Sequence, residues 1–501
     1  MIKLDPRKTV FLSFVFCALT AIASRAQSFT SLASFDGANG YMPWSTTLIQ
    51  ATDGNFYGTT SQGGGSTNCD PYINGCGTVF KITPAGKLTM LHSFHNTDGV
   101  QPFAGLVQAT DGNFYGTTSG GGANNFGTVF KITPAGRLTT LHSFDGTTDG
   151  AAPESGLVQP TDENFYGTTS GGWASNKHGG DCGTVFKITS AGTLTTLYGF
   201  DGTDGAIPHA GLVQATDGNF YGTTGADGNA TVFKITPGGK VTTLYSFCPK
   251  AGCADGDSPY AGLVQATEGN FYGTTHNGGA STACQLGCGT VFKITPAGKL
   301  TTLHSFHNTD GVQPFTGLVQ ATDGNFYGTT SSGGANNFGT VFKITPAGTL
   351  TTLHSFDGTD GAYPNGGLVQ ATDGNFYGTT TLGGTGANCG LGGCGTVFSL
   401  SVGLDPFVKT EPTSGEAGAA IIILGTDLTG ATSVTFNGVA AAFTAVSSSE
   451  IEATVPAGAS SGKVEVSTPH GALSSNVPFR VAPKLRHTLR PPLRPRSTVG
   501  M

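Results

Sequence analysis

The hexapeptide Asn-Phe-Tyr-Gly-Thr-Thr occurs seven times in this chain of 501 residues. Successive copies are 50 to 58 residues apart. A period near fifty, made of short strands and turns, is typical of a β-propeller with one blade per repeat. The phenylalanines of the seven copies are Phe56, Phe114, Phe165, Phe220, Phe271, Phe326 and Phe376.

Each repeat contains the signals of four short antiparallel strands. Asp-Gly and Pro-Ala-Gly sequences predict two tight turns, because glycine accepts positive φ. Apolar residues on both faces of the third strand favour blades that are stacked on both sides. In the second repeat the four strands are expected at 106–110, 113–118, 128–133 and 138–144.

The two ends of the repeat region are complementary. The seventh repeat stops after its third strand, at 396–400, whereas residues 29–35 match the fourth-strand pattern of 138–144. We therefore expect an all-β fold over 27–402, a seven-bladed β-propeller closed by its N-terminal strand. This strand removes the open sheet edge that the seventh blade otherwise presents.

The repeat unit, which reads Asp-Gly-Asn-Phe-Tyr-Gly-Thr-Thr at 373–380, resembles that of the bacterial choice-of-anchor tandem repeat proteins of the GloVer type. Its strand and turn order is also similar to that of NHL-type propellers. The resemblance implies a surface or secreted protein. Residues 403–482 resemble an IPT/TIG domain in the segments 412–418, 421–425 and 434–438. They are expected to form a small immunoglobulin-like β-sandwich, a spacer or binding module.

The two ends of the chain differ from the rest in composition. Residues 1–26 combine a basic start, an apolar stretch and a small-residue cleavage site, which predicts a signal peptide. Residues 483–501 are basic and rich in proline, and we expect them to be disordered. The predicted location is therefore secreted, extracellular or periplasmic, with no membrane span after signal removal. The chain has a formal net charge of −7 despite these basic ends, so its body is unsuited to nucleic acid.

Eight of the nine cysteines beyond the signal form close sequence pairs, which predicts local disulfides that staple the variable loops in an oxidising compartment. Zinc is the alternative for close cysteine pairs, but these pairs have no histidine partners at matching spacing. Cys182 is left over. The predicted pairs are Cys69/Cys76, Cys248/Cys253, Cys284/Cys288 and Cys389/Cys394.

The connections between blades are acidic and glycine-rich, and they share one face with the variable loops that follow each second strand. Variable loops on one side indicate where a ligand sits. Oxygen-rich loops of this kind can hold calcium, although turn formation by Asp and Asn is the simpler interpretation. No other cofactor or metal is expected. The candidate binding residues are Asp98, Asp149, Asp204, Asp255, Asp310, Asp360 and Trp173.

Two classes of function remain open. No His-Glu-x-x-His motif occurs, and residues 81–136 and 293–348 are almost identical. Copies of one surface favour multivalent, non-enzymatic recognition of a polysaccharide or a surface protein by the variable-loop face. No catalytic residue is expected. The alternative is a secreted carbohydrate-active hydrolase or lyase with its site at the propeller centre.

Overall fold

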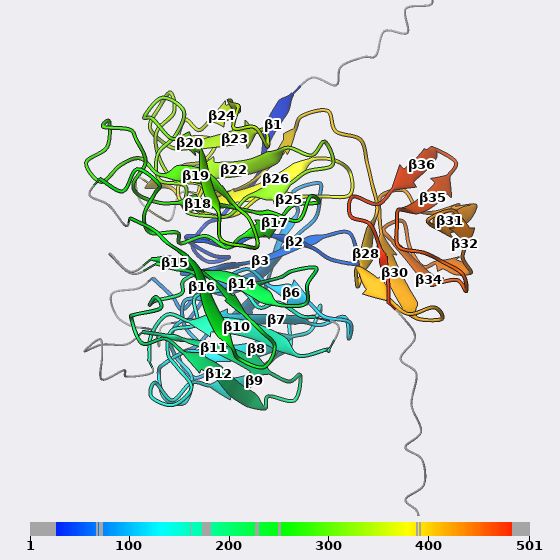
Figure 1. The fold of residues 1–501 in the computed structure, drawn as a ribbon, viewed down its shortest axis with the longest axis horizontal. Coiled ribbons are helices and arrows are strands. Elements are labelled where there is room, and N and C mark those ends of the chain that lie inside the picture. The colour runs from blue at the N-terminus through cyan, green and yellow to red at the C-terminus, as the bar shows by residue number, and fades with distance from the viewer. Residues whose placement is uncertain are drawn as a thin grey trace, which may run out of the picture.

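A computed structural model describes residues 27–66, 69, 74–160, 162–172, 182–225, 230–248, 252–386, 389 and 392–482. The described residues form strands and turns with no α-helix, which confirms the predicted all-β class. The repeat region forms a series of separate small sheets, and the C-terminal part forms a second body beside them (Figure 1). No helix of the described part is long and apolar enough to cross a membrane.

Strands that occupy the same place in successive repeats have nearly the same bounds. The first strands are β2 (Ile49–Gln50), β6 (Val107–Gln108), β13 (Val213–Gln214), β17 (Val264–Gln265), β21 (Val319–Gln320) and β25 (Val369–Gln370). The second strands are β3 (Phe56–Thr60), β7 (Phe114–Thr118), β10 (Phe165–Thr169), β14 (Phe220–Thr224), β18 (Phe271–Thr275), β22 (Phe326–Thr330) and β26 (Phe376–Thr380). The third strands are β4 (Thr78–Ile82), β8 (Thr128–Ile132), β11 (Thr184–Ile188), β15 (Thr231–Ile235), β19 (Thr290–Ile294), β23 (Thr340–Ile344) and β27 (Thr396–Ser401). The fourth strands are β5 (Leu88–Ser93), β9 (Leu138–Ser143), β12 (Leu194–Gly199), β16 (Val241–Ser246), β20 (Leu300–Ser305) and β24 (Leu350–Ser355).

The first strand of each sheet is shorter than the sequence pattern predicts. In the second repeat, 106–110 was expected but β6 covers two residues, because the Asp-Gly turn begins at Ala109. The Ala109 amide donates to the carbonyl of Asn113, and the amide of Gly112 donates to Ala109. In the third repeat only a bridge between Val158 and Tyr166 remains.

The predicted closure by the N-terminal strand is confirmed. Strand β1 (Ser28–Ser34) pairs antiparallel with β27, so the order of this sheet is β1-β27-β26-β25. The ring of Phe29 stacks on that of His354 with centroids 3.7 Å apart. The first repeat also meets the seventh at the first strands, because the Thr372 amide donates to Gln50 Oε1.

Stacked aromatic rings join each sheet to the next. The tyrosine of each second strand packs on the phenylalanine of the following second strand, with ring centroids 4.0–4.3 Å apart. The last pair leads back to the first repeat, so the stacks form a closed cycle. The pairs are Tyr57–Phe114, Tyr115–Phe165, Tyr166–Phe220, Tyr221–Phe271, Tyr272–Phe326, Tyr327–Phe376 and Tyr377–Phe56.

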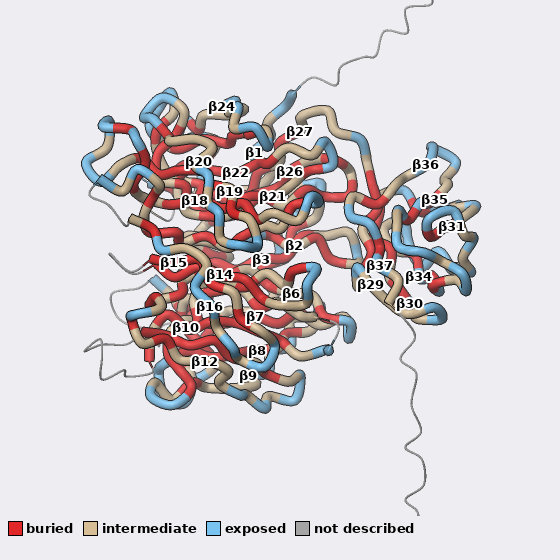
Figure 2. The backbone as a smooth tube through the Cα atoms, in the orientation of Figure 1, coloured by how far each residue is buried: buried red, intermediate tan, exposed pale blue. Residues whose placement is uncertain are grey.

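The glycine of the repeated hexapeptide is required by this packing. A Cβ atom on Gly116 would lie 2.7 Å from the ring of Phe130 and 2.8 Å from Leu106. Every residue of the second strands is buried, and the burial follows the strands through the repeat region (Figure 2). The Phe-Tyr pairs are therefore core residues of the repeat region.

The C-terminal body is a small β-sandwich. One sheet has the order β28-β30-β34-β33 and the other β32-β31-β35-β36, while β29 pairs with β37. Its core includes Ile423, Val434 and Val464. The strands are β28 (Lys409–Glu411), β29 (Ser414–Gly415), β30 (Ala420–Leu424), β31 (Ser433–Phe436), β32 (Val439–Ala440), β33 (Phe443–Ala445), β34 (Glu450–Thr454), β35 (Val464–Thr468), β36 (Gly471–Ser474) and β37 (Arg480–Val481).

The sandwich packs on the side of the repeat region that carries the Asp-Gly turns. Ser449 Oγ donates to the carbonyl of Thr52, and Arg480 donates to the carbonyl of Thr216. Lys409 is half-buried at this contact and donates from Nζ to the carbonyl of Gln370, and desolvation lowers its pKa. The opposite, variable-loop side is the side that the sandwich leaves free.

Candidate functional site

The six candidate aspartates each bind a side chain of the fourth strand in their own repeat. The aspartate lies in the connection between sheets and accepts from a histidine or tyrosine, which fixes the connection to the outer strand. Several aspartates also accept from a backbone amide of the same turn, as Asp98 does from His95. The pairs are His92–Asp98 (3.0 Å), His142–Asp149 (2.6 Å), Tyr245–Asp255 (2.7 Å), His304–Asp310 (3.0 Å), His354–Asp360 (2.8 Å) and Tyr198–Asp204.

The closing blade shows why these pairs recur. Strand β1 has Ala33 where β24 has His354, and the connection after β1 has Asn39 where the connection after β24 has Asp360. The aspartate is thus replaced where its strand partner is missing. This substitution within one chain indicates that the aspartates stabilise the connection; a ligand-binding role for them stays a prediction.

The predicted cysteine pairing is confirmed. The structure contains all four disulfides, which excludes those cysteines as zinc ligands in this state. Cys182 is fully buried. Trp173, together with His178 of the same loop, lies outside the described residues. The disulfides are Cys69–Cys76, Cys248–Cys253, Cys284–Cys288 and Cys389–Cys394.

The Cys248–Cys253 disulfide differs from the expectation that the pairs staple the variable loops. Cys253 lies in the connection between blades that follows β16, whereas the other three pairs lie in loops after second strands. The backbone of Cys253 is left-handed, with a φ of 43°, although the sequence patterns placed positive φ only at glycines. This conformation lets the Cys253 carbonyl accept from the amides of Gly256 and Gly279, so the connection is tied to the variable loop after β18. The sequence did not reveal this link between the connection and the loop, because Gly279 is distant from Cys253 along the chain.

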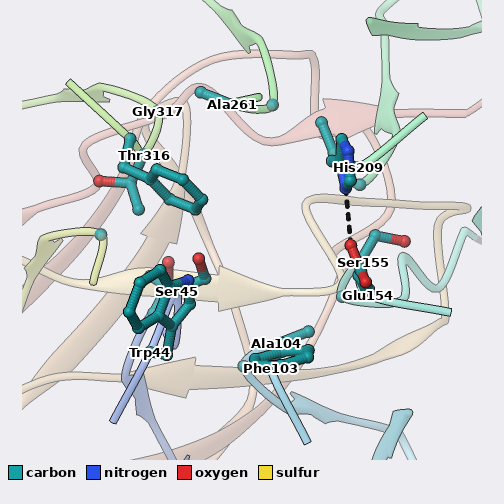
Figure 3. A pocket seen from close by; sticks show the side chains of 18 of the residues that line it. Trp44, Ser45, Phe103, Ala104, Glu154, Ser155, His209, Ala261, Thr316 and Gly317 are labelled. Carbon is teal, nitrogen blue, oxygen red and sulfur yellow. Dashed lines mark hydrogen bonds and ion pairs between the residues drawn. The ribbon is translucent and has the colours of Figure 1, made fainter. Parts of the chain in front are cut away.

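A cavity of about 920 Å³ lies at the centre of the repeat region. Residues from all seven repeats line it, mostly from the connections that lead into the first strands (Figure 3). These connections form isolated bridges with the loops after the second strands, such as Val100 with Gly120, so the cavity belongs to the variable-loop face. Its volume is in the range of small-ligand sites.

One position of the repeat supplies the cavity with chemically different side chains. It is the residue directly after the proline that precedes each first strand, and we call these seven residues the collar residues. All but Asn365 line the cavity; Asn365 is buried and accepts from the hydroxyl of Ser331. The collar residues are Trp44, Phe103, Glu154, His209, Tyr260, Phe315 and Asn365.

The backbone before each collar residue is held in an unusual conformation. The residue preceding the proline has a φ between 51° and 57° in all seven repeats, although none is glycine. Left-handed backbone is unfavourable for such residues, above all for the β-branched Ile207. In the second repeat, Gln101 is fixed there because its amide donates to the Cys76 carbonyl and its own carbonyl accepts from Ser119. Strained backbone of this kind is concentrated at functional sites.

The hexapeptide of each repeat is hydrogen-bonded to the segment that carries the collar residue of the following repeat. Thr59 Oγ1 donates to the carbonyl of Ala104, which follows the collar residue Phe103. The equivalent bond recurs around the ring, from Thr117 to Ser155 and onward. The exception is Thr379, whose buried hydroxyl has no hydrogen-bond partner among the described residues. Each blade therefore positions its neighbour's contribution to the cavity.

Aromatic rings cover one part of the cavity wall. The rings of Trp44 and Phe315 meet edge to face with centroids 5.9 Å apart, and those of Phe315 and Tyr260 lie 5.5 Å apart. His276 contacts both Tyr260 and Phe315, and burial lowers its pKa despite a hydrogen bond to Asn277. Its imidazole packs edge to face on these two rings, although His276 itself does not line the cavity.

A carboxylate and an imidazole stand beside these rings. Glu154 Oε2 lies 2.6 Å from His209 Nδ1, and both side chains are about one-third exposed (Figure 3). They come from neighbouring repeats, 55 residues apart. The two groups present a hydrogen-bonding pair to the cavity next to an apolar wall.

Comparison with known proteins identifies the repeat. The sequence model of the Gloeobacter/Verrucomicrobia repeat matches residues 67–286 and 282–427, which is more than half of the chain. This chain belongs to the Gloeobacter/Verrucomicrobia repeat family. The IPT/TIG domain matches residues 407–481, in agreement with the C-terminal sandwich. No curated protein sequence matches significantly.

Solved structures resemble this Gloeobacter/Verrucomicrobia repeat protein only in fold. A gluconolactonase of Xanthomonas campestris is 11% identical, with a TM-score of 0.37, over 76% of this chain and 92% of its own. A luciferin-regenerating enzyme is 11% identical, with a TM-score of 0.41, over 76% and 98%. A chain of a nidogen/laminin complex is 16% identical, with a TM-score of 0.37, over 56% and 91%. Likenesses this distant assign no activity.

The collar of this Gloeobacter/Verrucomicrobia repeat protein was missed by sequence reasoning. The near identity of the repeats pointed to copies of one surface, whereas the ring centre receives a different side chain from most blades. The signal was present in the sequence, because the residue after the Pro that precedes each first strand varies from Trp to Glu while the surrounding repeat stays similar. Reading it required knowing that this position faces the axis.

Proposed function

We propose that this protein is an exported, non-enzymatic binding protein that takes a saccharide into the axial cavity. The observation that carries the proposal is the collar, where the position that differs between otherwise similar repeats is the one that lines the cavity. A ring of unlike side chains makes one asymmetric site. In this proposal the main recognition surface is the single axial site, and not seven copies of a site on the variable loops.

The chemistry of the wall supports a saccharide. Sugar rings have apolar faces that pack on aromatic side chains and hydroxyls that need hydrogen-bond partners at their edges. The aromatic surface is supplied by Trp44, Tyr260 and Phe315. The hydrogen-bond partners are Glu154 and His209. Binding sites of this size are mostly apolar with a few placed polar groups.

Export is supported by the four disulfides and by the family of the repeat. The IPT/TIG domain is proposed to act as a spacer, since it packs on the side of the Asp-Gly turns. It therefore leaves the cavity face available to a ligand on another surface.

A secreted carbohydrate-active enzyme is the second candidate, and one observation favours it. The Glu154–His209 contact places two titratable groups in the cavity, 2.6 Å apart, as a general acid or base and its positioning partner would be. The binding proposal is preferred because no second carboxylate accompanies Glu154 among the cavity-lining residues described, whereas glycoside hydrolysis ordinarily uses a pair of them.

The test is a glycan array with the full chain, followed by titration of the best ligand. Trp44→Ala should weaken binding at least roughly tenfold, which corresponds to about 1.4 kcal/mol. Leu286→Ala is the matched control, because Leu286 is 68% exposed on the same face but does not line the cavity. Its affinity should equal that of the native protein.

Prolonged incubation of the array ligand separates the two candidates. An intact ligand supports binding alone. Turnover that Glu154→Gln abolishes establishes the enzyme and overturns the binding proposal. Retention of a surface protein, with no glycan bound, overturns the saccharide as ligand.

A further inference from the structure

Two histidines and an aspartate converge at the end of β20. His304 belongs to the strand, while His307 and Asp310 lie in the connection that follows it. One nitrogen of each histidine and one carboxylate oxygen of Asp310 lie within 4.8 Å of one another. Asp310 Oδ2 is 3.0 Å from His304 Nε2 and 4.0 Å from His307 Nδ1, so this oxygen faces both rings.

The backbone fixes this arrangement before any ion arrives. The amide of His307 donates to Asp310 Oδ1 at 2.7 Å, which turns the second oxygen toward the rings. The amides of Asp310 and Gly311 both donate to the carbonyl of His307. Only the side chain of His307, which is 59% exposed, needs to turn for all three donors to meet one ion.

We propose that His304, His307 and Asp310 bind a divalent transition-metal ion such as Zn²⁺. Two imidazoles and one carboxylate are a donor set that suits zinc and its neighbours, whereas calcium prefers oxygen ligands. Three protein ligands leave at least one coordination position open. The exposure of His307 places that position toward solvent, where water or a ligand's oxygen can fill it.

The first repeat contains the same set, at the end of β5. Residues 92–99 and 304–311 have the same sequence, His-Ser-Phe-His-Asn-Thr-Asp-Gly. His92 contacts Asp98 at 3.0 Å, and the amide of His95 donates to Asp98 at 2.8 Å, as in the first set. In this structure the His95 ring does not join the other two donors. The amides of Asp98 and Gly99 both donate to the carbonyl of His95, as in the first set, so a turn of the His95 side chain is what this second site requires. We therefore infer two metal sites in each chain.

The repeat that ends with β24 provides a natural comparison. Strand β24 is followed by the same turn, and His354 contacts Asp360, but Asp357 stands in place of His307. The side chain of Asp357 accepts from the amides of Thr359 and Asp360 and is therefore engaged in the turn. This repeat keeps the histidine–aspartate contact without the second imidazole.

The experiment is a calorimetric titration of the untagged full chain with ZnCl₂ at pH 7.5. Two equivalents of Zn²⁺ should bind to the native protein and one to the His307→Asn variant. The His95→Asn/His307→Asn double variant should bind neither. His95 and His307 are chosen because their loss leaves the His92–Asp98 and His304–Asp310 contacts in place. His470→Asn, in the C-terminal sandwich, is the control and should keep both equivalents.

Absence of binding to the native protein at micromolar free zinc overturns the proposal, and so does the same stoichiometry in the double variant. A single equivalent that His307→Asn removes supports the site after β20 and rejects its counterpart after β5 of the first repeat. Calcium chloride in the same titration should give no heat that depends on either histidine. The readout is independent of the proposed saccharide site.

Discussion

At the residue scale, the repeated Asp-Gly-Asn-Phe-Tyr sequence is explained by one set of contacts. The hydroxyl of Tyr115 donates to Asp111 at 2.9 Å, and Lys131 of the neighbouring strand reaches the same oxygen at 2.8 Å. The turn is thereby fixed to two strands of its sheet. Burial alone would raise the pKa of Asp111, but hydrogen bonds from Lys131, Asn113 and Tyr115 outweigh it and lower the pKa to about 2.

The low pKa of Asp111 predicts an acid-sensitive contribution to stability. Its folded-state pKa lies below the ordinary value of 3.8, so the stabilisation is complete above about pH 4 and is lost as the pH falls through about 2. Asp111→Asn should lower the urea midpoint at pH 6 and make little difference at pH 2. Lys131→Met should shrink the same pH dependence, because it removes a donor to the carboxylate. A difference between native and Asp111→Asn proteins that is independent of pH contradicts this account.

At the element scale, closure depends on a strand from the opposite end of the chain. Phe35, just after β1, is fully buried and packs edge to face on Phe80 with centroids 5.1 Å apart. Phe356 occupies the same place after β24 and packs on Phe398 at 5.3 Å. The non-covalent closure of the seventh sheet thus reproduces the packing of a continuous repeat.

Equal packing predicts equal cost of truncation. Phe35→Ala and Phe356→Ala should each reduce the free energy of unfolding by about 3–5 kcal/mol, since each leaves a large cavity. Denaturant unfolding of both variants measures this. A much smaller loss for Phe35→Ala would mean that β1 detaches in solution, contrary to the closed ring.

Three of the disulfides act on the loops after second strands. They close short segments, with sequence separations of 4 to 7, and Cys76, Cys288 and Cys394 are fully buried next to the cavity connections. The carbonyls of Cys76 and Cys288 accept from the left-handed residues Gln101 and Gln313. These disulfides therefore support the backbone that positions the collar.

Removal of the Cys284–Cys288 disulfide is a direct test of this support. The Cys284→Ser/Cys288→Ser variant should lose about 1–3 kcal/mol, because the loop is short. It should also bind the array ligand more weakly than the native protein, since Gln313 precedes the Pro314–Phe315 segment.

Peptide mapping without reduction should recover all four disulfide pairs in the native protein. Any other pairing contradicts the structure.

At the scale of the whole molecule, a cycle of stacked rings makes every blade depend on both neighbours. An open repeat array unfolds in parts, because each unit contacts only adjacent ones and the ends fray. A closed ring has no end from which unfolding can start. The IPT/TIG domain and the axial cavity occupy opposite sides of this ring.

Closure predicts cooperative unfolding of the repeat region. Tyr221→Ala, which removes one stacked ring, should lower the thermal midpoint of all blades together, at a cost of about 3–5 kcal/mol. Hydrogen exchange under mildly destabilising conditions should show β3 and β22 opening with the same free energy as β14. Loss of protection confined to β13–β20 would show that the blades unfold separately.

The sequence by itself determined the strands, the turns, the repeat and its closing strand, and the disulfide pairs. These features depend on local turn chemistry, on the alternation of apolar residues and on complementary chain ends, all of which are visible along the chain. The tertiary structure decided the roles of the side chains. The aspartates of the connections bind His or Tyr of their own strands, whereas the collar residues other than Asn365 line the axial cavity. That difference depends on which strand is innermost and on the left-handed backbone before the Pro, because residues some fifty positions apart become neighbours only when the ring closes.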